Sequence, residues 1–136
     1  RCPHNNADFL HMVWGCPIIA VAWNSVLDNV AEIIEQEVPC TPESTLLGIR
    51  RVSRQNKHPN RFINLATTLY KRQIAMTWKA RKAPEVTVWC KILLKWSMAE
   101  VSALRDMPDR NHNLESIQKW DSYVHELTIR NDNKPP

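Results

Sequence analysis

Apolar residues recur at steps of three and four positions along most of the chain, which is the period of an amphipathic α-helix. The clearest case is residues 17–37, where Pro17 suits the first turn of a helix and Pro39 stands beyond its end. The opposite face of this segment is acidic. Its apolar positions, which predict one buried side, are Ile19, Trp23, Val26, Val30 and Ile33.

Three further segments have the same period and predict helices at about 61–79, 85–106 and 114–128, the first of them capped by Asn60. Apolar positions on one side of each segment predict the core. These positions are Phe62, Ile63, Ala66, Leu69, Tyr70, Ile74 and Trp78; Val86, Trp89, Leu93, Trp96, Val101 and Leu104; and Leu114, Ile117, Trp120, Val124 and Leu127.

A short helical turn is predicted between the helix at 17–37 and the helix at 61–79. Thr41 is a good N-cap, Pro42 fits the first helical position, and Gly48 can end the turn in a left-handed conformation. Leu46 and Leu47 are expected to point inward. The polar, basic stretch that follows, residues 50–59, is predicted to be an exposed loop.

These elements predict an all-α fold, a bundle of four to five helices with an incomplete zinc-knuckle-like segment at its N-terminus. No segment has a sustained strand pattern, and two glycines in 136 residues disfavour a turn-rich β architecture. The chain is 43% apolar, enough for one core. We divide it into a partial Cys/His motif at 1–16, a helical domain at 17–128 and a frayed tail at 129–136.

The net charge of +4 is distributed unevenly along the chain. Residues 1–48 hold one basic residue against six acidic ones, and residues 97–136 hold five against seven. The central residues 49–96 hold twelve basic residues and a single acid, Glu85. A basic block with almost no compensating acid is typical of a surface that binds a polyanion, although a solvated helix face is the simpler alternative.

We therefore predict a surface that binds RNA or DNA through its phosphates. The predicted contact residues are Arg50, Arg51, Arg54, Lys57, Lys71, Arg72, Lys79, Arg81 and Lys82. Of the six tryptophans, four lie on apolar stripes and are expected in the core. Trp14 and Trp78 remain candidates for contact with bases.

Thiols and imidazoles near the N-terminus suggest a zinc site. Cys2, His11 and Cys16 can supply three ligands, and His11 and Cys16 have the spacing seen in zinc knuckles. His4 is a weak fourth ligand because it is only two positions from Cys2, so the fourth is expected upstream of Arg1. The simpler alternative is a loop thiol beside a half-exposed histidine.

Catalytic patterns are poorly supported by the sequence. Two glycines cannot build a phosphate-binding loop, no Gly-x-Ser-x-Gly elbow occurs, and the acidic residues are scattered rather than paired. Wide, uneven cysteine spacing argues against a disulfide scaffold and for a reducing compartment, cytoplasmic and nuclear. No apolar run approaches the length of a membrane span, so no membrane partner is expected.

Several short motifs follow one another along the chain. They are His11-Met-Val-Trp14-Gly-Cys16-Pro17, Trp23-Asn24-Ser25-Val26, Val38-Pro39, Pro42-Glu43-Ser44-Thr45-Leu46-Leu47-Gly48-Ile49, Ile74-Ala75-Met76-Thr77-Trp78-Lys79, Ala83-Pro84, Trp89, Ser97-Met98-Ala99-Glu100 and Trp120. In this order, and over about residues 11–127, they resemble the C-terminal segment of LINE-type (non-LTR) retrotransposon polyproteins, which follows a Cys-rich motif ending in His-x4-Cys.

The resemblance implies a non-catalytic appendage of a reverse transcriptase, which helps to hold template RNA or target DNA. The endonuclease and the RNA-directed DNA polymerase of such proteins lie upstream, and the reverse transcriptase domain would be a partner. The family pattern has two cysteines before the histidine, whereas only Cys2 precedes His11 here.

Two alternatives stay open at this point. The chain could be a helical protein-interaction module that docks on a polymerase body or a host protein, or a decayed retrotransposon fragment without activity. An enzyme that acts on its own is the weakest alternative, since no catalytic constellation is found.

Overall fold

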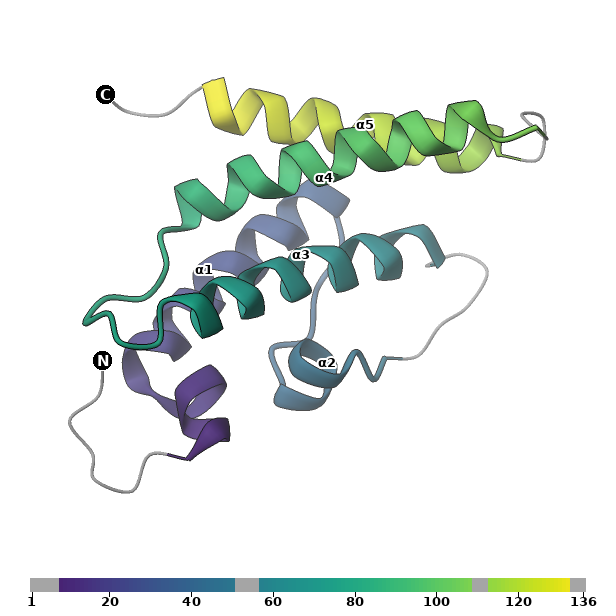
Figure 1. The fold of residues 1–136 in the computed structure, drawn as a ribbon. Helices are drawn as coiled ribbons and strands as arrows, with labels where there is room; N and C mark the ends of the chain where they lie inside the picture. The colour runs from purple at the N-terminus through teal and green to yellow at the C-terminus, as the bar shows by residue number, and fades with distance from the viewer. Residues whose placement is uncertain (1–7, 51–56, 109–112, 133–136) are drawn as a thin grey trace.

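The computed structural model describes residues 8–50, 57–108 and 113–132, and these residues form helices and connecting segments without a strand. The all-α prediction is confirmed (Figure 1). In the described residues a π-helical turn, η1, precedes one short and four long α-helices. The bounds are η1 His11–Gly15, α1 Pro17–Ile34, α2 Pro42–Leu47, α3 Lys57–Met76, α4 Val86–Asp106 and α5 Leu114–Asp132.

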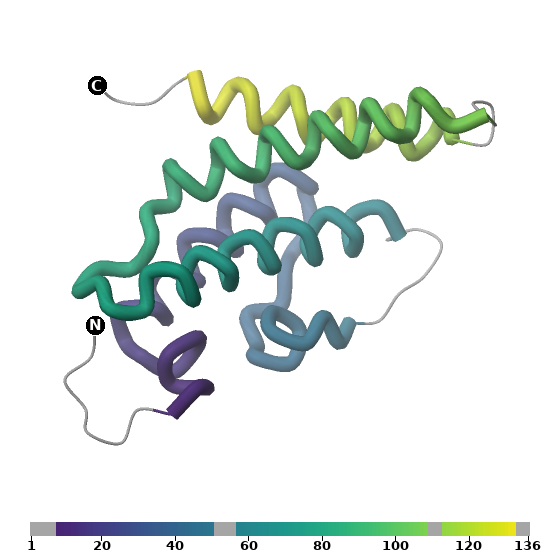
Figure 2. The backbone as a smooth tube through the Cα atoms, viewed as in Figure 1, coloured from purple at the N-terminus to yellow at the C-terminus, as the bar shows by residue number. Residues whose placement is uncertain are grey.

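The four long helices alternate in direction along the chain (Figures 1 and 2). α4 and α5 lie side by side as an antiparallel pair, and this pair covers α1 and α3. The short α2 packs against α3 on the side away from the pair. Among the helices that the structure describes, none lies over one long side of α3, and this side is exposed.

Large aromatic side chains fill the core where the long helices meet. The rings of Trp23 and Tyr70 lie 5.0 Å apart, and Tyr70 meets Trp89 edge-on with centroids 6.3 Å apart. The polar atoms of these rings are satisfied by backbone carbonyls, since Trp23 Nε1 donates to Val13 O (2.7 Å) and Trp89 Nε1 to Ala66 O (2.9 Å). Such buried donors cost stability unless they are paired.

The helix α1 supplies much of this core. Ile19, Val26 and Val30 are fully buried on its inner side, as the periodicity predicted. By length and composition alone, the 18-residue helix α1 is apolar enough to cross a membrane, and 44% of this helix is buried inside the bundle. The buried central helix of a globular bundle meets the same criterion, so this observation alone assigns no membrane contact.

The short turn α2 forms as its sequence predicts. The Thr41 side chain accepts a hydrogen bond from the Ser44 backbone N–H (3.2 Å), Pro42 opens the helix, and Gly48 ends it with φ of 69°. The prediction that Leu47 points inward is wrong, because this side chain is 71% exposed. Ser44 and Thr45 are buried in its place.

Four other side chains also lie differently from the prediction. Asn60 was expected to cap α3, but α3 begins at Lys57 and Asn60 is buried within it. Trp78 was placed on a helix that reaches residue 79, but α3 ends at Met76 and Trp78 is exposed. Trp96 and Leu114 were placed in the core, and both are exposed. These last two residues lie at the edges of their apolar stripes, where neighbouring helices decide whether a residue is covered.

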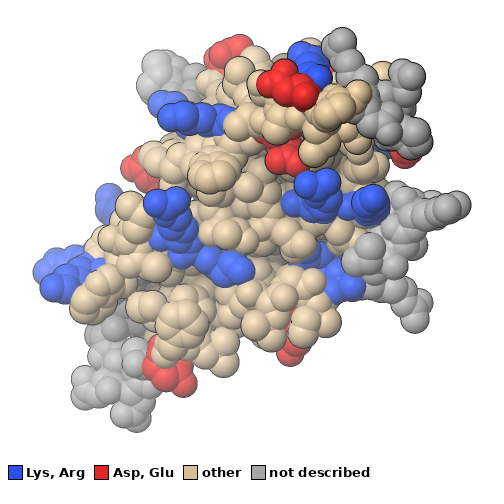
Figure 3. Space-filling model, turned by 45° about the vertical axis from the view of Figure 1, so that its right-hand side comes forward, with Lys and Arg blue, Asp and Glu red and all other residues tan. Residues whose placement is uncertain are grey.

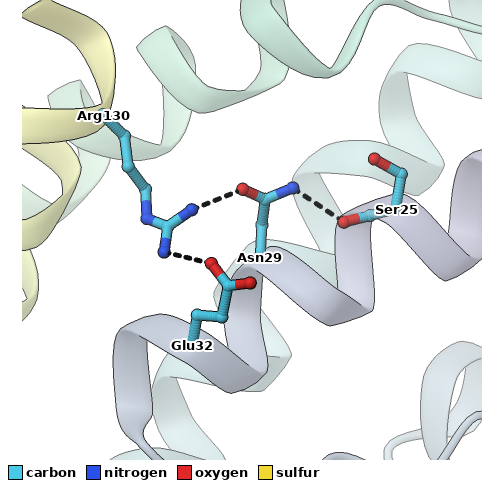
Figure 4. A network of polar contacts seen from close by, with 4 residues as sticks. All are labelled: Ser25, Asn29, Glu32 and Arg130. Carbon is cyan, nitrogen blue, oxygen red and sulfur yellow. Dashed lines mark hydrogen bonds and ion pairs between the residues drawn. The ribbon is translucent and has the colours of Figure 1, made fainter. Parts of the chain in front are cut away.

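The end of α5 is fastened to α1 by a polar network (Figure 4). Arg130 donates to Asn29 Oδ1 (2.7 Å) and to Glu32 Oε2 (2.6 Å), and Asn29 Nδ2 donates to Ser25 O (2.8 Å). α5 thus continues to Asp132, beyond the predicted end at residue 128. Residues 133–136 lie outside the described residues.

Candidate nucleic-acid interface

The side of α3 that no other helix covers carries basic and polar residues. Lys57, Arg61, Asn64, Thr68 and Arg72 are exposed and follow one another at steps of three or four, so they lie on one face. At a rise of 1.5 Å per residue this face is about 22 Å long from Lys57 to Arg72. We call it the α3 ridge.

The linker between α3 and α4 continues this basic surface. Lys79, Arg81 and Lys82 are exposed there, and the Lys79 ammonium lies 5.1 Å from the centroid of the Trp78 ring. Figure 3 shows the corresponding side of the molecule, where Lys and Arg side chains run in a band across the middle and acidic side chains lie mainly above and below it. The ridge and the linker together therefore form an electropositive strip.

Arg50, which was predicted to contact phosphate, instead holds α2 against α3. Its guanidinium donates to Ser44 O (2.6 Å) and Asn60 Oδ1 (3.0 Å), and it also contacts Asn64 Oδ1. Burial lowers the pKa of Arg50. A guanidinium with this many internal acceptors is a clamp between helices.

Lys71 is also engaged within the protein. Its Nζ donates to Leu46 O (2.9 Å), at the unsatisfied C-terminal end of α2. Burial, together with the positive charge of Arg50, lowers its pKa. Lys71 therefore contributes less to an external surface than its sequence position suggests.

Arg61 belongs to the α3 ridge, although the sequence prediction omitted it. Its Nη2 lies 3.0 Å from Glu100 Oε1 on α4, and both side chains are partly exposed. An exposed ion pair of this kind is weak and exchanges readily for other partners. The spacing of Arg61 from Lys57 and Arg72 places all three on one face of a helix, and this spacing could have predicted its position from the sequence. Arg51 and Arg54 lie outside the described residues.

Two apolar grooves flank the C-terminal end of the α3 ridge, and Arg72 borders both. The groove between α3 and α4, which we call the α3–α4 groove, has a volume of about 480 Å³. Its main apolar lining residues are Leu69, Met76, Val88, Ile92 and Trp96. The second groove, about 730 Å³, lies between α3, α2 and the N-terminal turn and is lined chiefly by Phe9, Leu10, Leu46, Leu47 and Ala75.

The structure does not support the predicted zinc knuckle. Cys16 is 2% exposed and is part of the hydrophobic core, whereas His11 is half-buried in η1 and its backbone N–H donates to Asp8 Oδ1 (2.8 Å). Among residues 8–50, 57–108 and 113–132 no group of three His, Cys, Asp or Glu side chains is placed to hold a metal. Cys2 and His4 lie outside the described residues.

Comparison of the chain with protein-family models, curated proteins and solved structures returned no match. The retrotransposon resemblance therefore has no support from a relative and stays a prediction. The function has to be argued from the charge, exposure and shape of the surface around α3.

Proposed function

We propose that this chain is a non-catalytic helical domain that binds nucleic acid through the α3 ridge and the following linker. The observation that carries the proposal is the charge of this surface. Residues 57–82 of α3 and the linker hold seven basic residues and no acid, and the exposed cations include Lys57, Arg72, Lys79, Arg81 and Lys82. Neutralising phosphates with such residues releases counterions, which supplies affinity without sequence specificity.

The biological setting that we propose follows from the sequence resemblance. As an appendage of a LINE-type reverse transcriptase, the domain would hold template RNA or target DNA near a polymerase in the cytoplasm or nucleus. Zinc bound through Cys2, His11 and Cys16 is not needed for this activity, because the basic surface is built on α3 and the linker.

The salt dependence of binding tests the proposal. The logarithm of the association constant for a labelled 20-nucleotide RNA should fall linearly with the logarithm of the salt concentration. Replacing Arg72 and Lys79 with Gln should reduce that slope by about 1.4, since each phosphate contact on a single strand contributes about 0.7. Fluorescence anisotropy between 50 and 300 mM salt measures both quantities.

The matched control removes two positive charges elsewhere. Lys91 is exposed and is the neighbour of the groove residue Ile92 on α4, so its side chain points about 100° away from the groove around the helix axis. Arg105 lies at the far end of α4 and pairs with Asp121 (2.8 Å). Replacing Lys91 and Arg105 with Gln should leave the slope nearly unchanged. Equal effects of the two pairs, or no RNA binding at low salt, would contradict the proposal.

One observation favours the alternative of a protein-interaction module. Phe9, Leu10 and Leu47 are all more than half exposed around the groove beside α2, and exposed apolar surface of this kind often marks a protein contact. A partner that remains bound after nuclease treatment, combined with no affinity for RNA or DNA, would select this function.

A further inference from the structure

Two of the six tryptophans are exposed on the basic side of the molecule. Trp96 on α4 is 49% exposed and Trp78 in the linker is 55% exposed, whereas Trp23, Trp89 and Trp120 are buried. An indole gains more from burial than almost any other side chain, so leaving it half in water sacrifices stability. Exposed aromatic rings beside cations therefore suggest a ligand that covers them.

A cation shares the surface around each exposed ring. Trp96 lines the α3–α4 groove, which Arg72 also lines, and Lys79 lies over the ring of Trp78. The volume of the groove, about 480 Å³, falls within the usual range for sites that hold small planar ligands. An apolar wall, an aromatic face and a nearby guanidinium suit a nucleobase with its phosphate.

We infer that this surface prefers single-stranded nucleic acid, with bases that stack on Trp96 and Trp78 while the α3 ridge and linker contact the backbone. This inference rests on the proposed function. In a duplex the faces of each base are covered by its neighbours, so an indole reaches them only where the strands are separated. Stacking tolerates any base, which agrees with a site that has few groups able to read base edges.

The charge around the groove favours a nucleic acid over an acidic protein helix. Arg72 and Glu85 are the charged residues that line the α3–α4 groove, so its walls present no row of cations matched to an acidic helix. The cations instead follow the α3 ridge and the linker beside the groove, an arrangement suited to a charged backbone with bases turned to one side.

The test compares a 20-nucleotide RNA with a duplex of the same sequence at one salt concentration. The wild-type chain should bind the single strand more tightly, and its tryptophan fluorescence should be quenched on binding. Trp96→Ala and Trp78→Ala should each weaken single-strand binding about 5- to 100-fold and leave duplex binding nearly unchanged. Met98→Ala, which alters another exposed side chain of α4, should change neither.

Heparin, a polyanion without bases, distinguishes stacking of bases on the tryptophans from attraction of the basic surface to negative charge. Both tryptophan variants should bind heparin as tightly as the wild-type chain, and circular dichroism spectra that match the wild-type spectrum establish that both are folded. Equal affinity for single strand and duplex, no quenching, or no effect of Trp78→Ala would overturn the single-strand inference and leave the proposed function standing. Loss of binding to every nucleic acid by the wild-type chain would overturn the proposed function itself.

Discussion

Arg50 acts at the scale of a single residue, as a link between α2 and α3. Its contacts with Ser44, Asn60 and Asn64 satisfy polar groups beside the core. Arg50→Ala would leave the Ser44 carbonyl and the Asn60 side chain without this donor. We expect the free energy of unfolding to fall by about 2 kcal/mol, measured by urea denaturation followed by circular dichroism.

Arg72→Ala is the matched control for this prediction. Arg72 lies on the exposed face of α3, so its removal should change the free energy of unfolding by less than about 0.5 kcal/mol while weakening RNA binding. If Arg50→Ala unfolds at the same urea concentration as the wild-type chain, the clamp assigned to Arg50 is wrong.

His58 makes the stability depend on pH. Burial is the main reason that its pKa is lowered from 6.5; Glu115 opposes the shift, while Lys57, Arg61 and Lys119 add to it. Because the unfolded chain binds this proton more readily, stability is lost as pH falls through 6.5 and then through the lower folded-state pKa. His58→Gln should reduce the loss of thermal stability between pH 7.5 and 5.5.

His125→Gln provides the comparison, since His125 is exposed on α5. The same pH series by differential scanning fluorimetry should then show a smaller loss of stability at low pH for His58→Gln than for His125→Gln. A loss of stability at low pH that is identical in the wild-type chain and His58→Gln would exclude His58 as its source.

At the residue scale, the sequence predicted burial better than it predicted the use of charge. Trp23 and Trp89 are buried because they lie at the centre of apolar stripes. The roles of Arg50 and Lys71 depend on backbone carbonyls of α2, which the fold brings within reach but which have no signature in the sequence. Trp96 is exposed because it lines the groove between α3 and α4 and does not lie in the packed core.

At the scale of helices, two residues have left-handed backbone conformations, and substitutions at these two positions should change the stability in opposite directions. Gly48 ends α2 with φ of 69°, and a Cβ there would lie 3.1 Å from Asn64 Oδ1. Glu35 ends α1 with φ of 57°, a conformation that suits glycine better than glutamate. Gly48→Ala should therefore destabilise the fold by about 1–2 kcal/mol, and Glu35→Gly should stabilise it by about 0.5 kcal/mol.

Thermal unfolding of the two variants checks this prediction. The double variant should show nearly additive effects because the two positions end different helices. A destabilising effect of Glu35→Gly would mean that the glutamate side chain makes a contribution larger than its backbone strain.

The sequence located the helices well because each is a long apolar stripe with a recognisable end. Pro17 and Gly48 mark boundaries by their backbone conformation and Thr41 by its capping side chain, and the structure places helix ends beside all three. The start of α3 at Lys57 was missed because Pro59 and Asn60 read as a loop and a cap. Proline is tolerated within the first turn of a helix, so its presence there did not stop α3 from beginning earlier.

At the scale of the whole molecule, charge is separated between faces. The basic ridge of α3 is open to solvent, whereas Glu32 of α1 pairs with Arg130 of α5 on another side. The excess of positive charge in residues 49–96 could be counted in the sequence, but the face of the molecule that carries this charge could not be predicted from it. The packing of α4 and α5 over α1 and α3 decides which basic residues share a face.

This separation predicts that a polyanion stabilises the fold by mass action. A ligand present at 100 times its dissociation constant adds about 2.7 kcal/mol to the free energy of unfolding, if it binds only the folded chain. For a chain of this size the melting temperature should rise by on the order of 10 °C in low salt. A 20-nucleotide RNA and heparin should both produce the rise, and 0.5 M salt should abolish it because counterion release no longer drives binding.

The same experiment distinguishes a shared basic face from positive charge scattered over the molecule. An unfolded chain of net charge +4 also attracts a polyanion, so scattered charge would give a small or negative shift in melting temperature. The variant with Arg72 and Lys79 replaced by Gln should lose much of the rise, whereas the variant with Lys91 and Arg105 replaced should keep it. A rise of equal size in both variants would mean that the α3 ridge and its linker are not where the polyanion binds.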